Sequence, residues 1–166
     1  GQNPYFITRH ISRYLQGGWK WMLIREMSLD DIPAVLPLYI SYYNEQEDGC
    51  WNEHTAAKRI HQVLSMEDSY GLIAENEKNV LGFAMGYFKQ YDDIIGYTLD
   101  EIVIAYPYQN KGIGSMLLKE LEERVKEKGA ACVELQAVND AMHERYYGKA
   151  GYKNAGNFVL KVKWFE

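Results

Sequence analysis

The chemically informative part of the sequence is the segment Leu99–Lys128, which reads as a strand, a turn and a helix. Its apolar residues first alternate and then recur at helical spacing, in Met116, Leu117, Leu121 and Val125. Between the two patterns lies the turn Gln109–Gly114, which contains two glycines. The first N–H groups of a helix have no intrahelical partner and carry the positive end of the helix dipole, and glycine lets an anion approach the backbone. The segment therefore predicts a phosphate-binding site.

Two common phosphate motifs do not match this turn. The P-loop string GxxxxGK[ST] is absent, and Leu117 stands where a dinucleotide fingerprint needs its third glycine. A longer string is more specific: Tyr108–Gly114, preceded by Asp100–Ile104, closely resembles the acetyl-CoA-binding motif of GNAT-superfamily N-acetyltransferases, Q/R-x-x-G-x-G/A. The resemblance covers roughly Met22 to Glu166.

The resemblance implies acetyl-CoA as co-substrate and no metal. In the family, the backbone of this turn holds the pyrophosphate, a lysine adds positive charge, and the residue after the turn donates a further hydrogen bond. In this sequence the residues implied to bind the pyrophosphate in these ways are Gln109, Asn110, Lys111, Gly112, Ile113, Gly114 and Ser115. The resemblance also implies that backbone groups of Ile104, Ala105 and Tyr106 pair with the pantetheine arm and stabilise the acetyl oxygen. Asn139 is expected to meet the pantetheine, with Asp140 as the alternative.

Glu101 is the candidate general base. An alkylammonium has a pKa of about 10.4 and cannot attack a thioester while it is protonated. The string Glu101-Ile102-Val103 resembles the strand of the related histone acetyltransferases in which that glutamate is the base. A carboxylate among apolar strand residues is also costly to bury without a reason. A chain of water molecules, or Asp100 on the opposite face of the strand, are the alternatives, and a glutamate at a solvated sheet surface is the non-functional interpretation.

Tyr147 is the candidate general acid for the leaving thiolate. The family carries an Asn and then Tyr-x-x-x-Gly-Phe on a helix, which resembles Tyr147–Tyr152. Counting back from Gly151 selects Tyr147, whereas counting forward from Asn139 selects Tyr146, so the choice between the tyrosines stays open.

The composition is that of one folded domain. The chain has 166 residues, of which 47% are hydrophobic, and no run of eighteen apolar residues that predicts a membrane span. A net charge of −5 argues against a nucleic-acid binder. Cys50 and Cys132 are isolated, which is typical of reduced cysteines in a cytoplasmic protein. Residues 1–21 have basic residues and no acidic ones, so they are read as an N-terminal extension with a short helix, followed by the domain 22–166.

Periodicity predicts strands over 22–27, 71–75, 80–89, 94–105, 131–137 and 158–165. It predicts helices starting at Ser28 and over 54–66, 113–128 and 139–150, with Pro37 kinking or dividing the first. This order resembles the GNAT arrangement, which implies an α/β (α+β) fold: a mixed, mostly antiparallel six- to seven-stranded sheet flanked by about four helices.

The sequence thus predicts an N-acetyltransferase that moves an acetyl group from acetyl-CoA to a primary amine of a small molecule or peptide by direct attack. The acidic and aromatic run Tyr42–Trp51 favours a cationic acceptor. A homodimer is compatible with the resemblance. The alternatives are a non-catalytic acetyl-CoA sensor on the same fold, and a membrane- or nucleic-acid-associated module acting through residues 1–21.

Overall fold

A computed structural model describes residues 22–77 and 79–166. The chain divides into two compact units, Gly1–Gln136 and Ala137–Glu166. The predicted helix in residues 1–21 lies outside the described residues, and the boundary of the extension stays a prediction.

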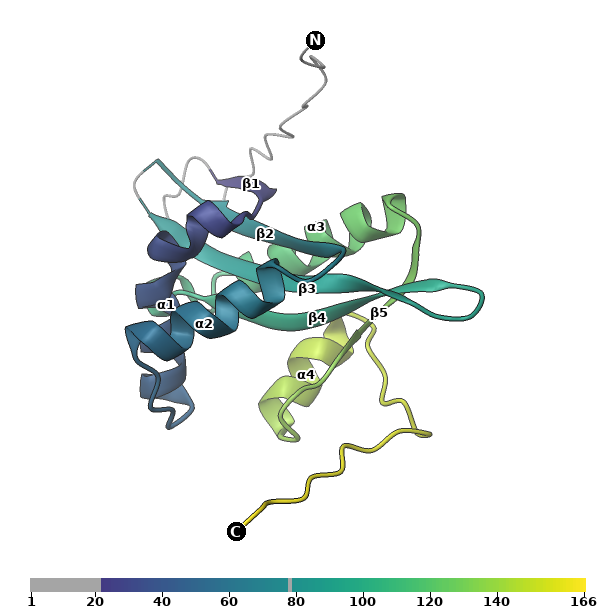
Figure 1. Ribbon diagram of the computed structural model, residues 1–166. Helices are drawn as coiled ribbons and strands as arrows, with labels where there is room; N and C mark the ends of the chain where they lie inside the picture. Colours follow the sequence, from purple (N-terminus) through teal and green to yellow (C-terminus); the bar gives the residue numbers. More distant parts are fainter. Residues whose placement is uncertain (1–21, 78) are drawn as a thin grey trace. The chain divides into compact units, whose positions relative to one another are not determined.

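The first unit contains a five-stranded sheet in the order β1-β2-β3-β4-β5. Its strands are β1 (Leu23–Glu26), β2 (Ser69–Glu75), β3 (Val80–Gln90), β4 (Ile95–Ile104) and β5 (Ala130–Leu135). The first four strands pair antiparallel, and β5 lies parallel to β4 (Figure 1). The mixed, mostly antiparallel sheet is confirmed, with five strands among the described residues in place of the six or seven expected.

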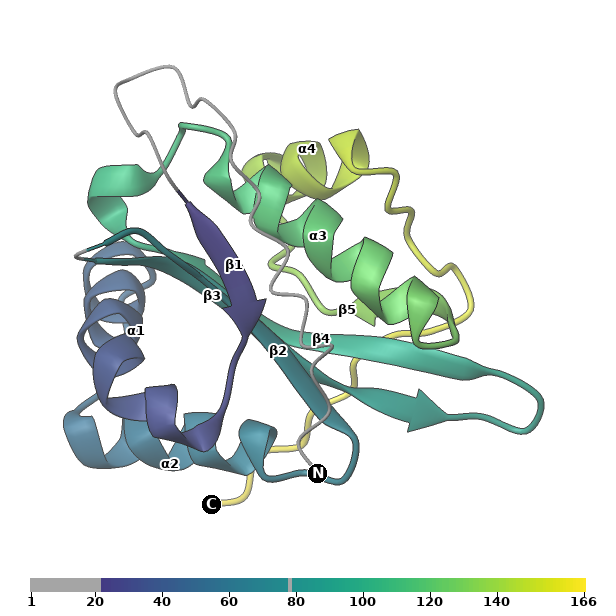
Figure 2. The ribbon, with the colours of Figure 1, turned by 90° about the horizontal axis from the view of Figure 1, so that it is seen from above.

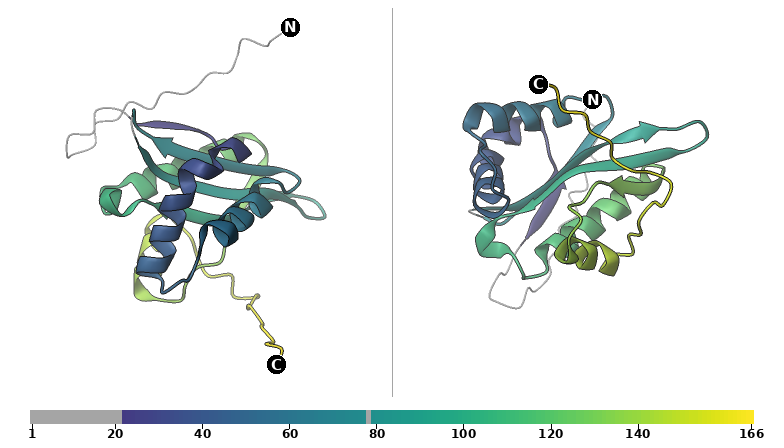
Figure 3. Two further views of the ribbon diagram at one scale, coloured as in Figure 1. Left: turned by 60° about the vertical axis from the view of Figure 1, so that its left-hand side comes forward. Right: turned by 90° about the horizontal axis from the view of Figure 1, so that it is seen from below.

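Helices cover both faces of this sheet. On one face lie α1 (Ile32–Gln46), which follows the 3-10 turn η1 (Leu29–Asp31), and α2 (Glu53–Leu64); α3 (Ile113–Glu127) lies on the other face (Figure 2). Figure 3 shows the same arrangement from two further directions. Ser28 starts the first helical segment as expected, because its N–H donates to the Asp31 carboxylate at 2.8 Å.

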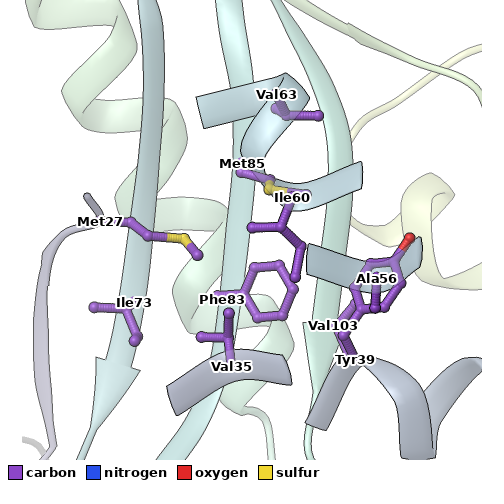
Figure 4. Close-up of a cluster of buried hydrophobic side chains, with 10 residues drawn as sticks. All are labelled: Met27, Val35, Tyr39, Ala56, Ile60, Val63, Ile73, Phe83, Met85 and Val103. Atoms are coloured by element: carbon purple, nitrogen blue, oxygen red, sulfur yellow. The ribbon is translucent and has the colours of Figure 1, made fainter. Parts of the chain in front are cut away.

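The apolar core between α1, α2 and the sheet fixes these helices in place. The residues that meet there are Met27, Val35, Tyr39, Ala56, Ile60, Val63, Ile73, Phe83, Met85 and Val103 (Figure 4). Val35 and Tyr39 are one helical turn apart on α1, and Val103 faces them from β4. Because the core holds α1 on both sides of Pro37, the helix runs through that proline undivided, at the cost of one backbone hydrogen bond.

The predicted strand over 158–165 is wrong. These residues form no strand, and their large apolar side chains are 60–88% exposed, at Phe158, Val159, Leu160, Val162, Trp164 and Phe165. A strand needs a neighbouring strand to satisfy its backbone, and the described residues of the second unit contain one helix, α4 (Ala141–Lys149), and no strand. The alternation of apolar and polar residues depends on this segment alone, whereas strand formation also depends on a second strand that can pair with it.

A β-bulge interrupts the pairing of β3 and β4 next to Glu101. Met85 pairs with Glu101 and Gly86 pairs with Leu99, so Asp100 is an extra residue in β4. The strands are in close contact at this point: a Cβ on Gly86 would lie 1.9 Å from the Thr98 carbonyl oxygen. Only glycine fits there without moving the backbone of β4.

Gly86→Ala is therefore expected to lower the free energy of unfolding by about 3 kcal/mol, because the strands must separate to admit the methyl group. Chemical denaturation of the full chain measures this. Gly148→Ala on α4 is the control, since a Cβ there meets no atom within 4 Å, and it should leave stability unchanged or slightly higher. Equal unfolding midpoints for the two variants would contradict the close contact at the bulge.

Candidate active site

The turn before α3 has the features of a phosphate cradle. Gly112 is the N-cap of α3 and has a left-handed conformation, with φ of +81°. It provides no side-chain cap for the first N–H groups, and the first turn of α3 contains no acidic residue. A Cβ at Gly112 would meet no other atom within 4 Å, so the space beside it is open. The first N–H groups of α3 thus have no side-chain cap and lie at the positive end of the helix dipole.

Gln109 anchors this turn to the end of β4. Its side-chain Nε2 donates to the Ile104 carbonyl oxygen at 2.9 Å. The backbone N–H of Gln109 donates to Tyr106 in the 3-10 turn η2 (Tyr106–Tyr108). The side chain of Gln109 therefore holds the turn in place.

The end of β4 has a free edge within the first unit. β4 pairs with β5 only as far as Leu99, and residues 100–104 have no strand partner on that side among the described residues of this unit. The N–H of Ala105 donates to Leu81 of the antiparallel neighbour at 2.9 Å. Because hydrogen-bonding directions alternate along a strand, Ile102 and Ile104 point their backbone groups to the free edge. The Ile104 carbonyl oxygen is bonded to Gln109, which leaves the Ile104 N–H at that edge.

Glu101 lies on the core-facing side of β4, two residues before Val103, with 12% of its side chain exposed. Tyr43 donates its hydroxyl to Oε2, and Tyr39 donates to Oε1 at 3.3 Å. The Nε of Arg59 is 3.6 Å from Oε1. Both carboxylate oxygens thus have partners, two from α1 and one from α2.

Burial raises the pKa of the Glu101 carboxyl above its ordinary value, although the hydrogen bond from Tyr43 and the charge of Arg59 lower it in part. Burial also raises the pKa of the Asp100 carboxyl, and Arg59 again acts in the opposite direction. Simple alternation places Asp100 on the face opposite Glu101, but the bulge interrupts the alternation here. One guanidinium therefore acts on two neighbouring carboxyls.

The sequence did not indicate Tyr39, Tyr43 and Arg59 as partners of Glu101. A signal for the tyrosines was present, because Val35, Tyr39 and Tyr43 follow one another at spacings of four residues and form a single stripe on α1. Arg59 borders the buried stripe of Ala56, Ile60 and Val63 on α2, where a basic residue is unusual. Nothing local in the sequence indicates that these side chains meet Glu101.

The loop after α1 is tied back to the helix by Asn44. Its Nδ2 donates to the Trp51 carbonyl oxygen, and its Oδ1 accepts from the Trp51 N–H, both at 2.8 Å. The Trp51 ring packs edge-on against Tyr39, with ring centroids 5.1 Å apart. Glu45 in the last turn of α1 and Glu47 and Asp48 in the loop are exposed. Aromatic rings and exposed carboxylates therefore occur in one short segment.

In the second unit, Tyr147 and Tyr146 are adjacent on α4, with ring centroids 4.9 Å apart, and Tyr147 also packs against Tyr152 at 5.7 Å. Asp140 is the N-cap of α4, because its carboxylate accepts from the His143 N–H at 2.8 Å. Asn139 and Asp140 are both exposed. The relation of these residues to acetyl-CoA stays a prediction.

The described residues contain no group of three or more His, Cys, Asp or Glu side chains arranged to hold a metal ion. Among the same residues, no helix has the length and apolar character needed to cross a membrane.

Comparison with known proteins identifies the family. The sequence model of the acetyltransferase (GNAT) family matches residues 32–152, a span that includes β4, the turn and α4. The chain belongs to the GNAT family of acetyltransferases. This confirms the expected membership of the GNAT family and the expected enzyme class, an N-acetyltransferase.

Two relatives come from Bacillus subtilis strain 168. The uncharacterised protein YxbD is 31% identical over 97 residues, which are 58% of this chain and 57% of that protein. The uncharacterised N-acetyltransferase YhfO is 28% identical over 144 residues, which are 83% of this chain and 94% of that protein.

Among solved structures, an aminoglycoside N-acetyltransferase in complex with CoA is similar with a TM-score of 0.68. The match covers 86% of this chain and 94% of that one at 15% identity, so it supports the GNAT fold alone.

Gln109→Leu is expected to loosen the turn of this acetyltransferase, because the substitution removes the bond to the Ile104 carbonyl. Hydrogen exchange of the backbone amides of residues 111–115 should become faster, while global stability falls by no more than about 1.5 kcal/mol. Gln90→Leu, which removes a glutamine side-chain bond at the β3–β4 hairpin, is the control and should leave those amides unchanged. Unaltered exchange in Gln109→Leu would show that the turn does not depend on this bond.

Proposed function

We propose that this protein is an acetyl-CoA-dependent N-acetyltransferase that transfers the acetyl group to a primary amine of a small molecule or peptide by direct attack. The observation that carries the proposal is the combination, in one unit, of an open helix N-terminus after β4 and the half-buried carboxylate of Glu101 on β4. The first suits a pyrophosphate and the second suits the removal of a proton from an ammonium group.

The backbone of Gln109–Gly114 is proposed to hold the pyrophosphate of acetyl-CoA, with Lys111 adding charge and Ser115 a further hydrogen bond. The N–H at the free edge of β4, that of Ile104, is the donor that this geometry favours for the pantetheine arm or the acetyl oxygen. When bound, acetyl-CoA supplies the thioester whose acetyl group is transferred. Asn139 is proposed to contact the pantetheine, with Asp140, the N-cap of α4, as the alternative.

Glu101 is proposed as the general base, acting directly or through water. A base is most effective when its pKa approaches the working pH, and burial moves the pKa of this carboxyl upward in that direction. The carboxylate accepts protons only above its pKa, so the rate should rise as the pH climbs through that value. Tyr147 is proposed to protonate the leaving thiolate, on the match of Tyr147–Tyr152 to the family motif.

The acceptor is proposed to be a cationic amine. The exposed carboxylates of Glu45, Glu47 and Asp48 would attract a positive charge, and the Trp51 ring offers a face for cation–π contact. Aminoglycosides, the substrates named for one structural neighbour, are amines of this kind. We further propose a cytoplasmic location, and a homodimer stays a prediction. The competing hypothesis is an acetyl-CoA sensor without turnover, which would have no use for Glu101 and Tyr147.

The test is thiol release from acetyl-CoA, followed colorimetrically with a panel of polyamines, aminoglycosides, amino acids and lysine-containing peptides. Release with one class of amine is expected, and Glu101→Gln should lower kcat by about 100-fold, most severely at low pH where less of the amine is already neutral. Lys58→Gln, an exposed charge change on α2, is the control and should retain full activity. Binding of acetyl-CoA without release across the panel would favour the sensor.

Tyr147→Phe is expected to lower kcat by at least about tenfold without weakening acetyl-CoA binding, because only the proton for the leaving thiolate is lost. Tyr146→Phe is the matched control on the same helix and should retain activity. Steady-state kinetics and calorimetric titration measure the two effects. The reverse ranking of the two variants would assign the general acid to Tyr146.

A further inference from the structure

Glu101 is surrounded by hydrogen-bond donors and charged groups from three elements. From α1, the hydroxyls of Tyr39 and Tyr43 donate to it; from α2, Arg59 approaches at 3.6 Å; and on β4 itself, Asp100 is its neighbour at the bulge. From β3, the facing residue is Met85, which does not titrate. Each of these titratable groups acts on whether the carboxyl carries a proton.

The geometry assigns a different partner to each carboxylate oxygen. Tyr43 bonds to Oε2, whereas Tyr39 and Arg59 both approach Oε1. Because different partners hold the two oxygens, the carboxylate cannot rotate freely about the Cγ–Cδ bond of Glu101. Tyr39 is a core residue with 1% of its surface exposed, so its position is set by packing. Tyr43 and Arg59 lie at the edge of the core, where their polar groups face Glu101.

We propose that Tyr43 and Arg59 are positioning residues for Glu101, which fix the orientation of its carboxylate and keep it ionised in a half-buried site beside a second carboxylate. This inference rests on the proposed function, because it explains how Glu101 serves as a base. Without these two partners, burial and the negative charge of Asp100 would both favour the protonated form, which cannot accept a proton.

The two residues contribute differently. The Tyr43 hydroxyl stabilises the ionised form more than the protonated one by donating a hydrogen bond to it, and its own pKa is raised by burial and by the charge of Glu101, so it stays a neutral donor. Arg59 supplies the positive charge that compensates Glu101 and Asp100 together. Removal of either residue should therefore raise the pKa of the Glu101 carboxyl, and a lysine in place of Arg59 should restore the charge without the guanidinium shape.

The experiment is a pH titration of the Glu101 carboxyl carbon by NMR, in the full chain labelled with ¹³C-glutamate, with the resonance assigned by its loss in Glu101→Gln. In Tyr43→Phe and Arg59→Met the titration midpoint is expected to move up by about one pH unit. Arg59→Lys should keep the midpoint near that of the wild type. Thermal unfolding of each variant shows that it is folded.

Two matched controls separate this effect from a general loss of hydroxyls or charge. Tyr91→Phe removes a tyrosine hydroxyl that donates to another carboxylate, that of Glu134, at 2.6 Å, and Lys58→Gln removes a positive charge from the position before Arg59. Both should leave the Glu101 midpoint unchanged. Unmoved midpoints in Tyr43→Phe and Arg59→Met would overturn the inference.

Kinetics then connect the titration to the reaction. With a weakly basic amine as acceptor, whose own titration lies below the range studied, the acid limb of kcat should move with the NMR midpoint. In Tyr43→Phe and Arg59→Met, kcat at low pH should fall about tenfold below that of the wild type and should recover at high pH. Acetyl transfer with unshifted profiles would overturn the inference while leaving the proposed function intact. Shifted midpoints in a protein without acetyl transfer would overturn the proposed function and, with it, this role.

Discussion

A carboxylate beside an apolar core has to be compensated, because the core cannot replace the water that the charge loses. In this protein the compensation of Glu101 links three elements that are far apart in the sequence: β4 carries the carboxylate, α1 supplies two tyrosine hydroxyls and α2 supplies a guanidinium. The same α1 residues that pack the core also reach the charge. The arrangement of the helices on this face and the state of Glu101 are therefore determined together.

β4 meets several structural demands at once. The side of β4 that carries Val103 packs into the core, the backbone of β4 pairs with β3, and the residues of β4 after Leu99 do not pair with β5. The bulge at Asp100 lies where these demands meet, and Gly86 allows the two strands to approach there. A free strand edge followed by an open helix N-terminus places backbone donors, rather than side chains, along the path that a long phosphate-bearing ligand would follow.

The local motifs could be predicted from the sequence. The turn at Gln109–Gly114, the start of α3 and the hairpin of β2 and β3 each depend on residues a few positions apart, so pattern and structure agree. The residues around Glu101 could not be predicted in this way. Tyr39 and Tyr43 lie 62 and 58 positions before it, and their contact exists only because α1 crosses β4 in the folded chain. The bulge is also invisible in a pattern that assumes strict alternation.

The sequence by itself determined the family, the position of the glycine-containing turn before α3 and the identity of the carboxylate on β4, because each depends on short-range spacing. The tertiary structure decided which groups compensate that carboxylate, which backbone groups of β4 stay at the free edge, and that the alternating segment at 158–165 forms no strand. The physical reason is the same in all three cases: a charge, a strand edge and an amphipathic segment are each satisfied by partners from elsewhere in the chain. Only folding brings those partners together or leaves them apart.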